Sequence, residues 1–223
     1  MCHDGRVCLS FPEVVRPLVF LAARAYFRIR FEDVQHVPLN GPLLIVPNHV
    51  SYADPPLVSI SVSRPIYYMA WRQLFQVPGL GWLIRRLRAF PVEIETPNSR
   101  GPREAVRLLQ AGAAVMIFPE GGRSPDGRLQ QFKPGAFRLA ASLGIPVLPV
   151  TIAGAHEAWP PHRRLPRPGQ ITIIYHPTVI PPPGANPRGA AREVVRRVRA
   201  AVASRLPPHQ RPLDEPESGS VRP

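Results

Sequence analysis

Short apolar runs alternate with helix-like segments through most of this 223-residue chain. Strand-like runs, rich in β-branched and aromatic residues, occupy 43–49, 65–71, 89–95, 114–120, 146–154 and 171–177. Helix-like periodicity lies between or after them, at 55–63, 79–88, 102–111, 135–143 and 188–205. Strands connected by helices pair in parallel, because a crossover helix returns the chain to the starting edge of the sheet. We therefore predict an α/β fold with a largely parallel, mixed sheet flanked by helices.

The segment 13–30 predicts an additional N-terminal amphipathic helix. Its apolar residues, such as Val15, Leu18 and Ala22, recur at three- and four-residue spacing, and arginines lie between them. One interpretation is a helix that covers the core. The other is a helix that lies in a membrane interface, where arginine meets phosphate groups.

Length and composition fit one domain with tails. Apolar residues make up 44% of the chain, which is enough for a sizeable core. We predict a loose tail over 1–12 and a single globular domain over 13–206, with its motifs concentrated in 43–155. The polar, proline-rich end, 207–223, is expected to be disordered.

The charge is strongly positive, at +13, and Lys133 is the one lysine among 28 basic residues. Arginine without lysine, together with 31 prolines, is typical of a GC-rich genome, so part of this excess reflects codon usage. The functional interpretation is an anionic partner: a lipid headgroup, a nucleic acid or a phosphorylated substrate. Composition alone does not choose among them.

Several protein classes are disfavoured. Cys2 and Cys8 form neither a disulfide framework nor a metal-ligand pattern. The N-terminus lacks the apolar region of a signal peptide, and the longest uncharged window, 139–156, is interrupted by glycine and proline. We therefore expect an intracellular protein that does not span a membrane and holds no metal.

A first polar motif, Asn48-His49-Val50-Ser51-Tyr52-Ala53-Asp54, follows the apolar run that begins at residue 43. Ligand-handling residues collect at the carboxyl ends of strands in α/β sheets. An imidazole–carboxylate pair of His49 and Asp54 would leave one ring nitrogen to take a proton from a substrate hydroxyl. The alternative is a polar turn with Asp54 as a helix N-cap.

A second motif, Phe118-Pro119-Glu120-Gly121-Gly122-Arg123-Ser124, also follows an apolar run. Its glycines let backbone N–H groups approach an anion, and the planar guanidinium of Arg123 suits phosphate. Glu120 could accept hydrogen bonds from glycerol or sugar hydroxyls. On its own, the alternative is a glycine turn that carries one charge.

In this order, the two motifs and the strand 145–150 resemble the glycerophospholipid acyltransferase family, whose members acylate lysophosphatidic acid and related acceptors. The stretches 67–94 and 124–140 are similar to intervening family blocks. The resemblance extends from about residue 15 to 180. It implies that 13–206 is an acyltransferase domain.

The resemblance implies direct acyl transfer to a glycerol hydroxyl of a lysophospholipid acceptor. Acyl-CoA or acyl carrier protein (ACP) would be the co-substrate and partner, and no other cofactor is implied. The expected reaction is lysophosphatidic acid to phosphatidic acid. No acyl-enzyme is needed, and Ser51, which lacks a G-x-S-x-G elbow, is expected to be a local cap.

The resemblance also carries roles onto this chain residue by residue. His49 would be the general base and Asp54 its partner. Glu120 with Gly121 would shape the acceptor site, and Arg123 would hold the acceptor's phosphate.

Three departures from the family pattern concern the acceptor. Arg72 stands where relatives usually have lysine and could also face phosphate. Gly122 replaces a threonine, and Ile94 stands where an acceptor-binding arginine is expected. Either the acceptor is a different lyso-lipid, or another arginine substitutes for the missing one: Arg85, Arg86, Arg88 or Arg100.

The expected location is cytoplasmic, peripheral on the inner face of the cell membrane, because basic surface and the 13–30 helix would be drawn to anionic lipid. A rival from another class is a non-catalytic basic protein that binds membranes or nucleic acid. The chain carries no recognised nucleic-acid motif, so we expect no nucleic-acid partner.

Overall fold

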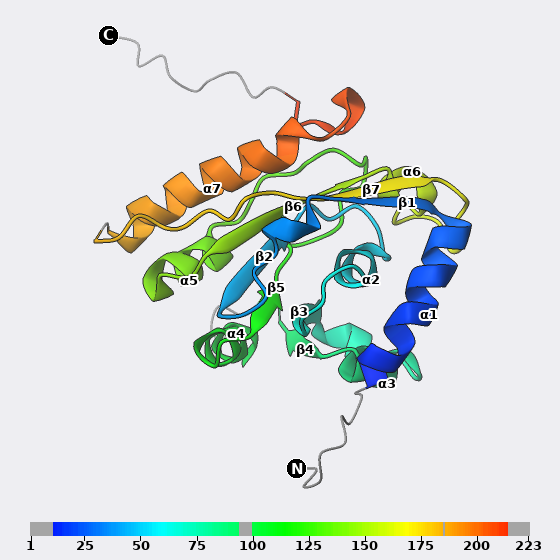
Figure 1. The fold of residues 1–223 in the computed structure, drawn as a ribbon, viewed down its shortest axis with the longest axis horizontal. Coiled ribbons are helices and arrows are strands. Elements are labelled where there is room, and N and C mark those ends of the chain that lie inside the picture. The colour runs from blue at the N-terminus through cyan, green and yellow to red at the C-terminus, as the bar shows by residue number, and fades with distance from the viewer. Residues whose placement is uncertain (1–10, 94–99, 185, 214–223) are drawn as a thin grey trace, which may run out of the picture.

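The computed structural model describes residues 11–93, 100–184 and 186–213 and confirms the α/β architecture (Figure 1). A seven-stranded sheet has the order β1-β7-β6-β2-β5-β3-β4. Its strands are β1 (Arg28–Glu32), β2 (Leu43–Pro47), β3 (Ile66–Trp71), β4 (Ala89–Val92), β5 (Ala114–Met116), β6 (Val147–Ala153) and β7 (Gln170–Tyr175). Every neighbouring pair is parallel except β6 with β7, which is antiparallel. The largely parallel, mixed sheet is therefore as predicted.

Helices cover both faces of this sheet (Figure 1). One hydrophobic cluster joins the sheet to α1, α2 and α6, and a second joins it to α4, α5 and α7. The helices are α1 (Phe11–Tyr26), α2 (Asp54–Ser59), α3 (Leu80–Arg86), α4 (Arg100–Gln110), α5 (Gly135–Leu143), α6 (Ala155–Ala158) and α7 (Pro187–Ser204). Short 3-10 helices are η1 (Val34–His36), η2 (Arg72–Gln76) and η3 (Pro208–Gln210).

Strand β2 shows why the apolar runs in the sequence are continuous. Leu43 and Ile45 belong to the first cluster, and Leu44 and Val46 belong to the second. A strand covered on both faces must be apolar at every position, because successive side chains point to opposite faces. The buried strand thus places the polar segment after it at a fixed edge of the sheet.

The predicted helix over 13–30 is wrong at its C-terminal end. Helix α1 stops at Tyr26, and Arg28–Glu32 forms β1, which pairs in parallel with β7. Ile29 is buried between the exposed Arg28 and Arg30, which is the two-residue period of an edge strand. Helix α1 also begins at Phe11, inside the segment predicted to be a tail.

Residues 207–213, predicted to belong to a disordered tail, pack against the domain. They include η3, and the buried side chain of Gln210 donates to the carboxylate of Glu157 at 2.7 and 2.9 Å. The remainder of the predicted tail, 214–223, lies outside the described residues.

The parallel pairing brings both sequence motifs to one edge of the sheet. Strands β2 and β5 are hydrogen-bonded neighbours, and β6 lies on the other side of β2. The segments 48–54 and 117–124 leave the carboxyl ends of β2 and β5, so they emerge side by side. Both strands end earlier than predicted because these residues turn out of the sheet.

Gly154, at the end of β6, provides a test of how tightly this edge is packed. Its φ is +83°, and a Cβ there would lie 2.1 Å from the carbonyl oxygen of Gln170. Gly144 also has a positive φ, +64°, but a Cβ there meets nothing within 4 Å. Gly144→Ala should cost about 1–2 kcal/mol of unfolding free energy, the cost of the left-handed conformation.

Gly154→Ala should cost about 1–3 kcal/mol more than Gly144→Ala, because the new methyl group overlaps backbone. Urea denaturation of the two variants beside the wild type measures the difference. Equal losses in both variants would contradict the packing described for this edge.

Candidate functional site

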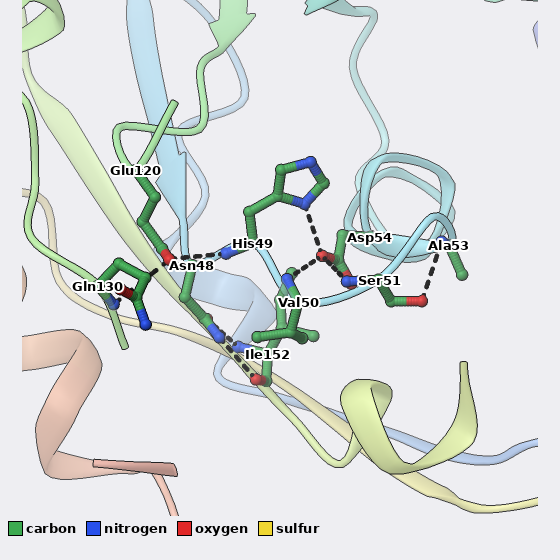
Figure 2. Close-up of polar contacts among 9 residues, drawn as sticks. All are labelled: Asn48, His49, Val50, Ser51, Ala53, Asp54, Glu120, Gln130 and Ile152. Carbon is green, nitrogen blue, oxygen red and sulfur yellow. Dashed lines mark hydrogen bonds and ion pairs between the residues drawn. The ribbon is translucent and has the colours of Figure 1, made fainter. Parts of the chain in front are cut away.

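The carboxylate of Asp54 organises the loop that follows β2 (Figure 2). Its Oδ2 accepts hydrogen bonds from the backbone N–H of Val50 at 2.7 Å and of Ser51 at 2.8 Å. The same oxygen lies 2.8 Å from Nδ1 of His49. Asp54 is fully buried at the start of α2. The predicted imidazole–carboxylate pair is therefore present, and the loop backbone holds its acidic member.

This arrangement sets the tautomer of His49. An oxygen that already accepts two backbone N–H groups also accepts from the ring, so Nδ1 is the donor, and in the neutral imidazole Nε2 keeps its lone pair. The ring stacks on Phe118, with centroids 4.0 Å apart and planes 26° apart. The side chain is 17% exposed, so a substrate can reach it. His49 is thus built to accept a proton at Nε2.

Asn48 fixes the point at which the loop leaves the sheet. Its buried amide donates to the carbonyl of Ile152 at 2.9 Å and accepts from the N–H of the same residue at 2.7 Å. Ser51 is also buried, and its Oγ accepts from the N–H of Ala53 at 3.2 Å. This contact is local, but it lies within the turn before α2, whose N-cap residue is Ala53 and which has no side-chain cap hydrogen bond, so Ser51 does not cap that helix.

Glu120 links the second motif to the first (Figure 2). Its Oε1 accepts from the backbone N–H of His49 at 2.8 Å, and its Oε2 accepts from that of Gln130 at 3.3 Å. Burial raises the pKa of Glu120 from its usual 4.5 to about 8, against the opposing effect of these two hydrogen bonds. The sequence predicts that Glu120 contacts hydroxyls of the acceptor. In the structure, its carboxylate joins the loop after β2 to the loop after β5.

Arg123 and Gly121 lie on the same turn. The guanidinium Cζ of Arg123 is 3.7 Å from the ring centroid of Tyr52, and its buried Nη1 has no hydrogen-bond partner. Gly121 has φ +75°, and a Cβ there would lie 2.5 Å from Nζ of Lys133, the one lysine of the chain. A Cβ at Gly122 would meet nothing within 4 Å, so glycine is not required there for space.

Arg72 stands apart from this group. It begins η2, after β3, and β5 lies between β3 and β2. Its guanidinium pairs with Glu93, and its side chain is 61% exposed. With Phe75, Gln76, Arg85, Ala89, Phe90 and Pro91 it lines an open cavity of about 460 Å³.

The residues proposed to replace the missing arginine are only partly described. Ile94 lies outside the described residues, as does the side chain of Arg100. Arg85 lines the cavity together with Arg72, and its guanidinium lies 5.3 Å from the ring centroid of Phe75. Arg86 instead lies over Trp82, at 5.4 Å.

Within the described ranges, the chain has neither a metal-ligand cluster nor a helix suited to crossing a membrane. Over 11–93, 100–184 and 186–213, no group of three or more histidine, cysteine, aspartate or glutamate residues could hold a metal ion. In that part of the chain, no helix has both the length and the apolar character to cross a membrane. Cys2 and Cys8 lie outside these ranges.

Sequence reasoning assigned no role to three residues of this site: Asn48, Tyr52 and Phe118. Asn48 could have been noticed as a polar residue at the end of a fully apolar strand. The contacts of Phe118 with His49 and of Tyr52 with Arg123 join residues far apart in the sequence, so no local sequence pattern predicts them.

Comparisons with known proteins agree with these observations. A family model described as Acyltransferase matches residues 28–153. The chain is 34% identical over 177 residues to a 1-acyl-sn-glycerol-3-phosphate acyltransferase of Chlamydomonas reinhardtii, which covers 77% of this chain and 50% of that protein. A protein of the same name from Pseudomonas aeruginosa is 29% identical over 201 residues, 86% of this chain and 76% of that protein.

A solved structure has a similar fold. It is the 1-acyl-sn-glycerophosphate (LPA) acyltransferase PlsC from Thermotoga maritima, with a TM-score of 0.67 and 27% sequence identity. The match covers 92% of this chain and 84% of that one. The chain spans only 43–50% of the length of the first curated relatives, which come from Arabidopsis thaliana, Chlamydomonas reinhardtii and Brassica napus.

The raised pKa of Glu120 predicts a pH dependence of stability. Between pH 4.5 and about 8, folded Glu120 holds a proton that the unfolded chain has released. The free energy of unfolding contributed by this residue therefore falls as the pH rises through that window. Glu120→Gln should remove this decline, because glutamine does not titrate.

Urea denaturation at several pH values between 5 and 8 measures the slope for both proteins. Glu193→Gln is a matched control, because that carboxylate is 39% exposed in a helical ion pair. A Glu120→Gln variant with the wild-type slope would contradict the assignment.

Proposed function

Because the chain belongs to the acyltransferase family, we propose that it moves an acyl group from an acyl thioester to the free hydroxyl of 1-acyl-sn-glycerol 3-phosphate, forming phosphatidic acid. The names of the relatives support this acceptor. The observation that carries the proposal is the 2.8 Å contact between His49 Nδ1 and Asp54 Oδ2, which makes Nε2 the proton acceptor of the neutral ring, on a side chain that is 17% exposed.

The chemistry needs a base more than it needs a nucleophile on the enzyme. An aliphatic hydroxyl has a very high pKa, close to that of water, which is about 15.7. A thiol, near 8.5, is a good leaving group. His49 therefore supplies what the acceptor lacks, and the thioester needs no prior transfer to the protein.

The proposed step is a direct displacement. Nε2 of His49 takes the hydroxyl proton as the oxygen attacks the thioester carbonyl, so an O–C bond forms and the C–S bond breaks. The departing thiolate then receives the proton from the imidazolium. Asp54 stabilises that imidazolium while its backbone hydrogen bonds keep the ring in place.

The second motif would hold the acceptor. Arg123 is suited to the phosphate because its buried Nη1 has no partner among the described residues. Gly121 permits the tight turn that brings this arginine beside the His49 loop. Glu120 joins the two loops through the backbone of His49.

A second candidate is acylation of a different lyso-lipid. The observation that favours it is the cavity that contains Arg72 and Arg85, two strands away from His49. Its guanidinium groups would suit a larger anionic headgroup. Rates for several lyso-lipids with one acyl donor separate the two candidates, and lysophosphatidic acid ranking last would refute the first.

The donor is proposed to be acyl-CoA or acyl-ACP, both of which present the same thioester. No metal or further cofactor enters the proposed step. The identity of the donor does not alter the role of His49, since the bond broken is the same.

We also propose that the protein works at the inner surface of the cell membrane, peripherally and from the cytoplasm. Helix α1 exposes Leu18 and Leu21, at 67% and 66%. The segment 71–83 exposes a further group beside Arg72 and Arg85: Trp71, Val77, Leu80, Trp82 and Leu83. Exposed apolar and aromatic side chains beside arginines suit a bilayer interface with anionic headgroups.

His49→Ala should lower the rate of acyl transfer to lysophosphatidic acid by about 10²–10⁴-fold, the contribution of a positioned base. The fold should survive, because the ring is partly exposed and Asp54 keeps two backbone donors. Radiolabelled acyl transfer and circular dichroism measure the two effects. His162→Ala, at an exposed position outside the site, is the control, and full activity in His49→Ala would refute the proposed base.

Removing apolar side chains from α1 should weaken membrane binding. Leu18→Ser combined with Leu21→Ser should lower partitioning onto anionic vesicles about ten-fold or more, since each leucine loses its buried apolar area. Vesicle flotation measures it. Leu165→Ser is a matched control, because Leu165 is 76% exposed but lies outside both groups. Equal losses of vesicle binding in the Leu18/Leu21 double variant and in Leu165→Ser would contradict a specific membrane-binding face.

A further inference from the structure

Three side chains form a ladder at the mouth of the site. Arg123 lies on the face of Tyr52 at 3.7 Å, and the Tyr52 ring lies 5.7 Å from that of Trp159. Trp159 is anchored in turn, because it packs on the first hydrophobic cluster and its Nε1 donates to the carbonyl of Arg163 at 3.1 Å. Arg123 is therefore connected to the hydrophobic core through the rings of Tyr52 and Trp159.

The charge of Arg123 has no acidic partner in the part of the chain that the structure describes. Among the described residues, no carboxylate lies within ion-pair distance of it, and its buried Nη1 has no hydrogen-bond partner. A buried, unpaired donor is costly unless a ligand completes it. The guanidinium is thus prepared for an anion that arrives with the substrate.

We propose that Tyr52 is a positioning residue that holds Arg123 for the phosphate group of the acceptor. The inference rests on the proposed function and adds a residue to it. An aromatic face attracts a guanidinium through its quadrupole and supports it from one side. A carboxylate in the same place would occupy the N–H groups and cancel the charge that the phosphate needs.

The place of Tyr52 in the chain explains why this matters. It lies between His49 and Asp54, so the loop that positions the base also positions the phosphate anchor. In 1-acyl-sn-glycerol 3-phosphate, the reacting hydroxyl and the phosphate are on neighbouring carbons. Coupling both contacts to one short loop fixes the hydroxyl relative to His49, which is what productive orientation requires.

Steady-state kinetics with lysophosphatidic acid tests the proposal. Tyr52→Leu should raise KM for this acceptor about ten-fold, an effect between those of an exposed and a fully desolvated cation–π contact. The KM for the acyl donor and the thermal unfolding midpoint should stay near wild type, because Tyr52 is 48% exposed. Tyr52→Phe, which keeps the ring, should retain most of the acceptor affinity.

A double-mutant cycle shows whether Tyr52 acts through Arg123. In an Arg123→Gln background, Tyr52→Leu should change the acceptor KM by less than about two-fold, because the partner is already gone. A full ten-fold effect there, or a Tyr52→Phe variant as impaired as Tyr52→Leu, would overturn the proposal. So would an unchanged KM in Tyr52→Leu. A wild-type protein that does not acylate lysophosphatidic acid would instead refute the proposed function.

Discussion

The geometry of the His49 loop depends on one oxygen atom, Oδ2 of Asp54. It accepts hydrogen bonds from two backbone N–H groups and from the ring of His49, all at 2.7–2.8 Å. The backbone contacts give the loop its shape, and the ring contact gives His49 its tautomer. Because one buried carboxylate makes all three, the shape of the loop and the chemistry of the base depend on the same charge.

The sheet supplies the frame around that oxygen. Parallel pairing of β2 with β5 and β6 brings three segments to one edge, and buried polar side chains connect them. Asn48 ties the His49 loop to β6, and Glu120 ties it to the loop after β5. Burial raises the pKa of Glu120 to about 8, so at neutral pH the protonated carboxyl predominates and the second connection adds little charge next to Asp54. The site is thus rigid at its base and open at its mouth.

The alternation of apolar runs and helical periodicity was enough to predict the layered sheet, because both faces of each central strand must be covered. The pair of His49 and Asp54 was predictable because both lie in the short motif 48–54, directly after an apolar run. The sequence does not reveal strand β1, because arginines alternate with Ile29 and Phe31 there, and Ile29 also fits the helical spacing of the apolar residues before it. The ladder of Trp159, Tyr52 and Arg123 needs three segments that meet only in the folded chain.

The central claim is that one hydroxyl of the acceptor meets Nε2 of His49 while its phosphate meets Arg123. A crystal structure with 1-acyl-sn-glycerol 3-phosphate bound measures this directly. The account predicts the free hydroxyl oxygen about 3 Å from Nε2 and the phosphate within hydrogen-bond distance of the guanidinium. A phosphate bound instead between Arg72 and Arg85, with the hydroxyl out of reach of His49, would contradict it.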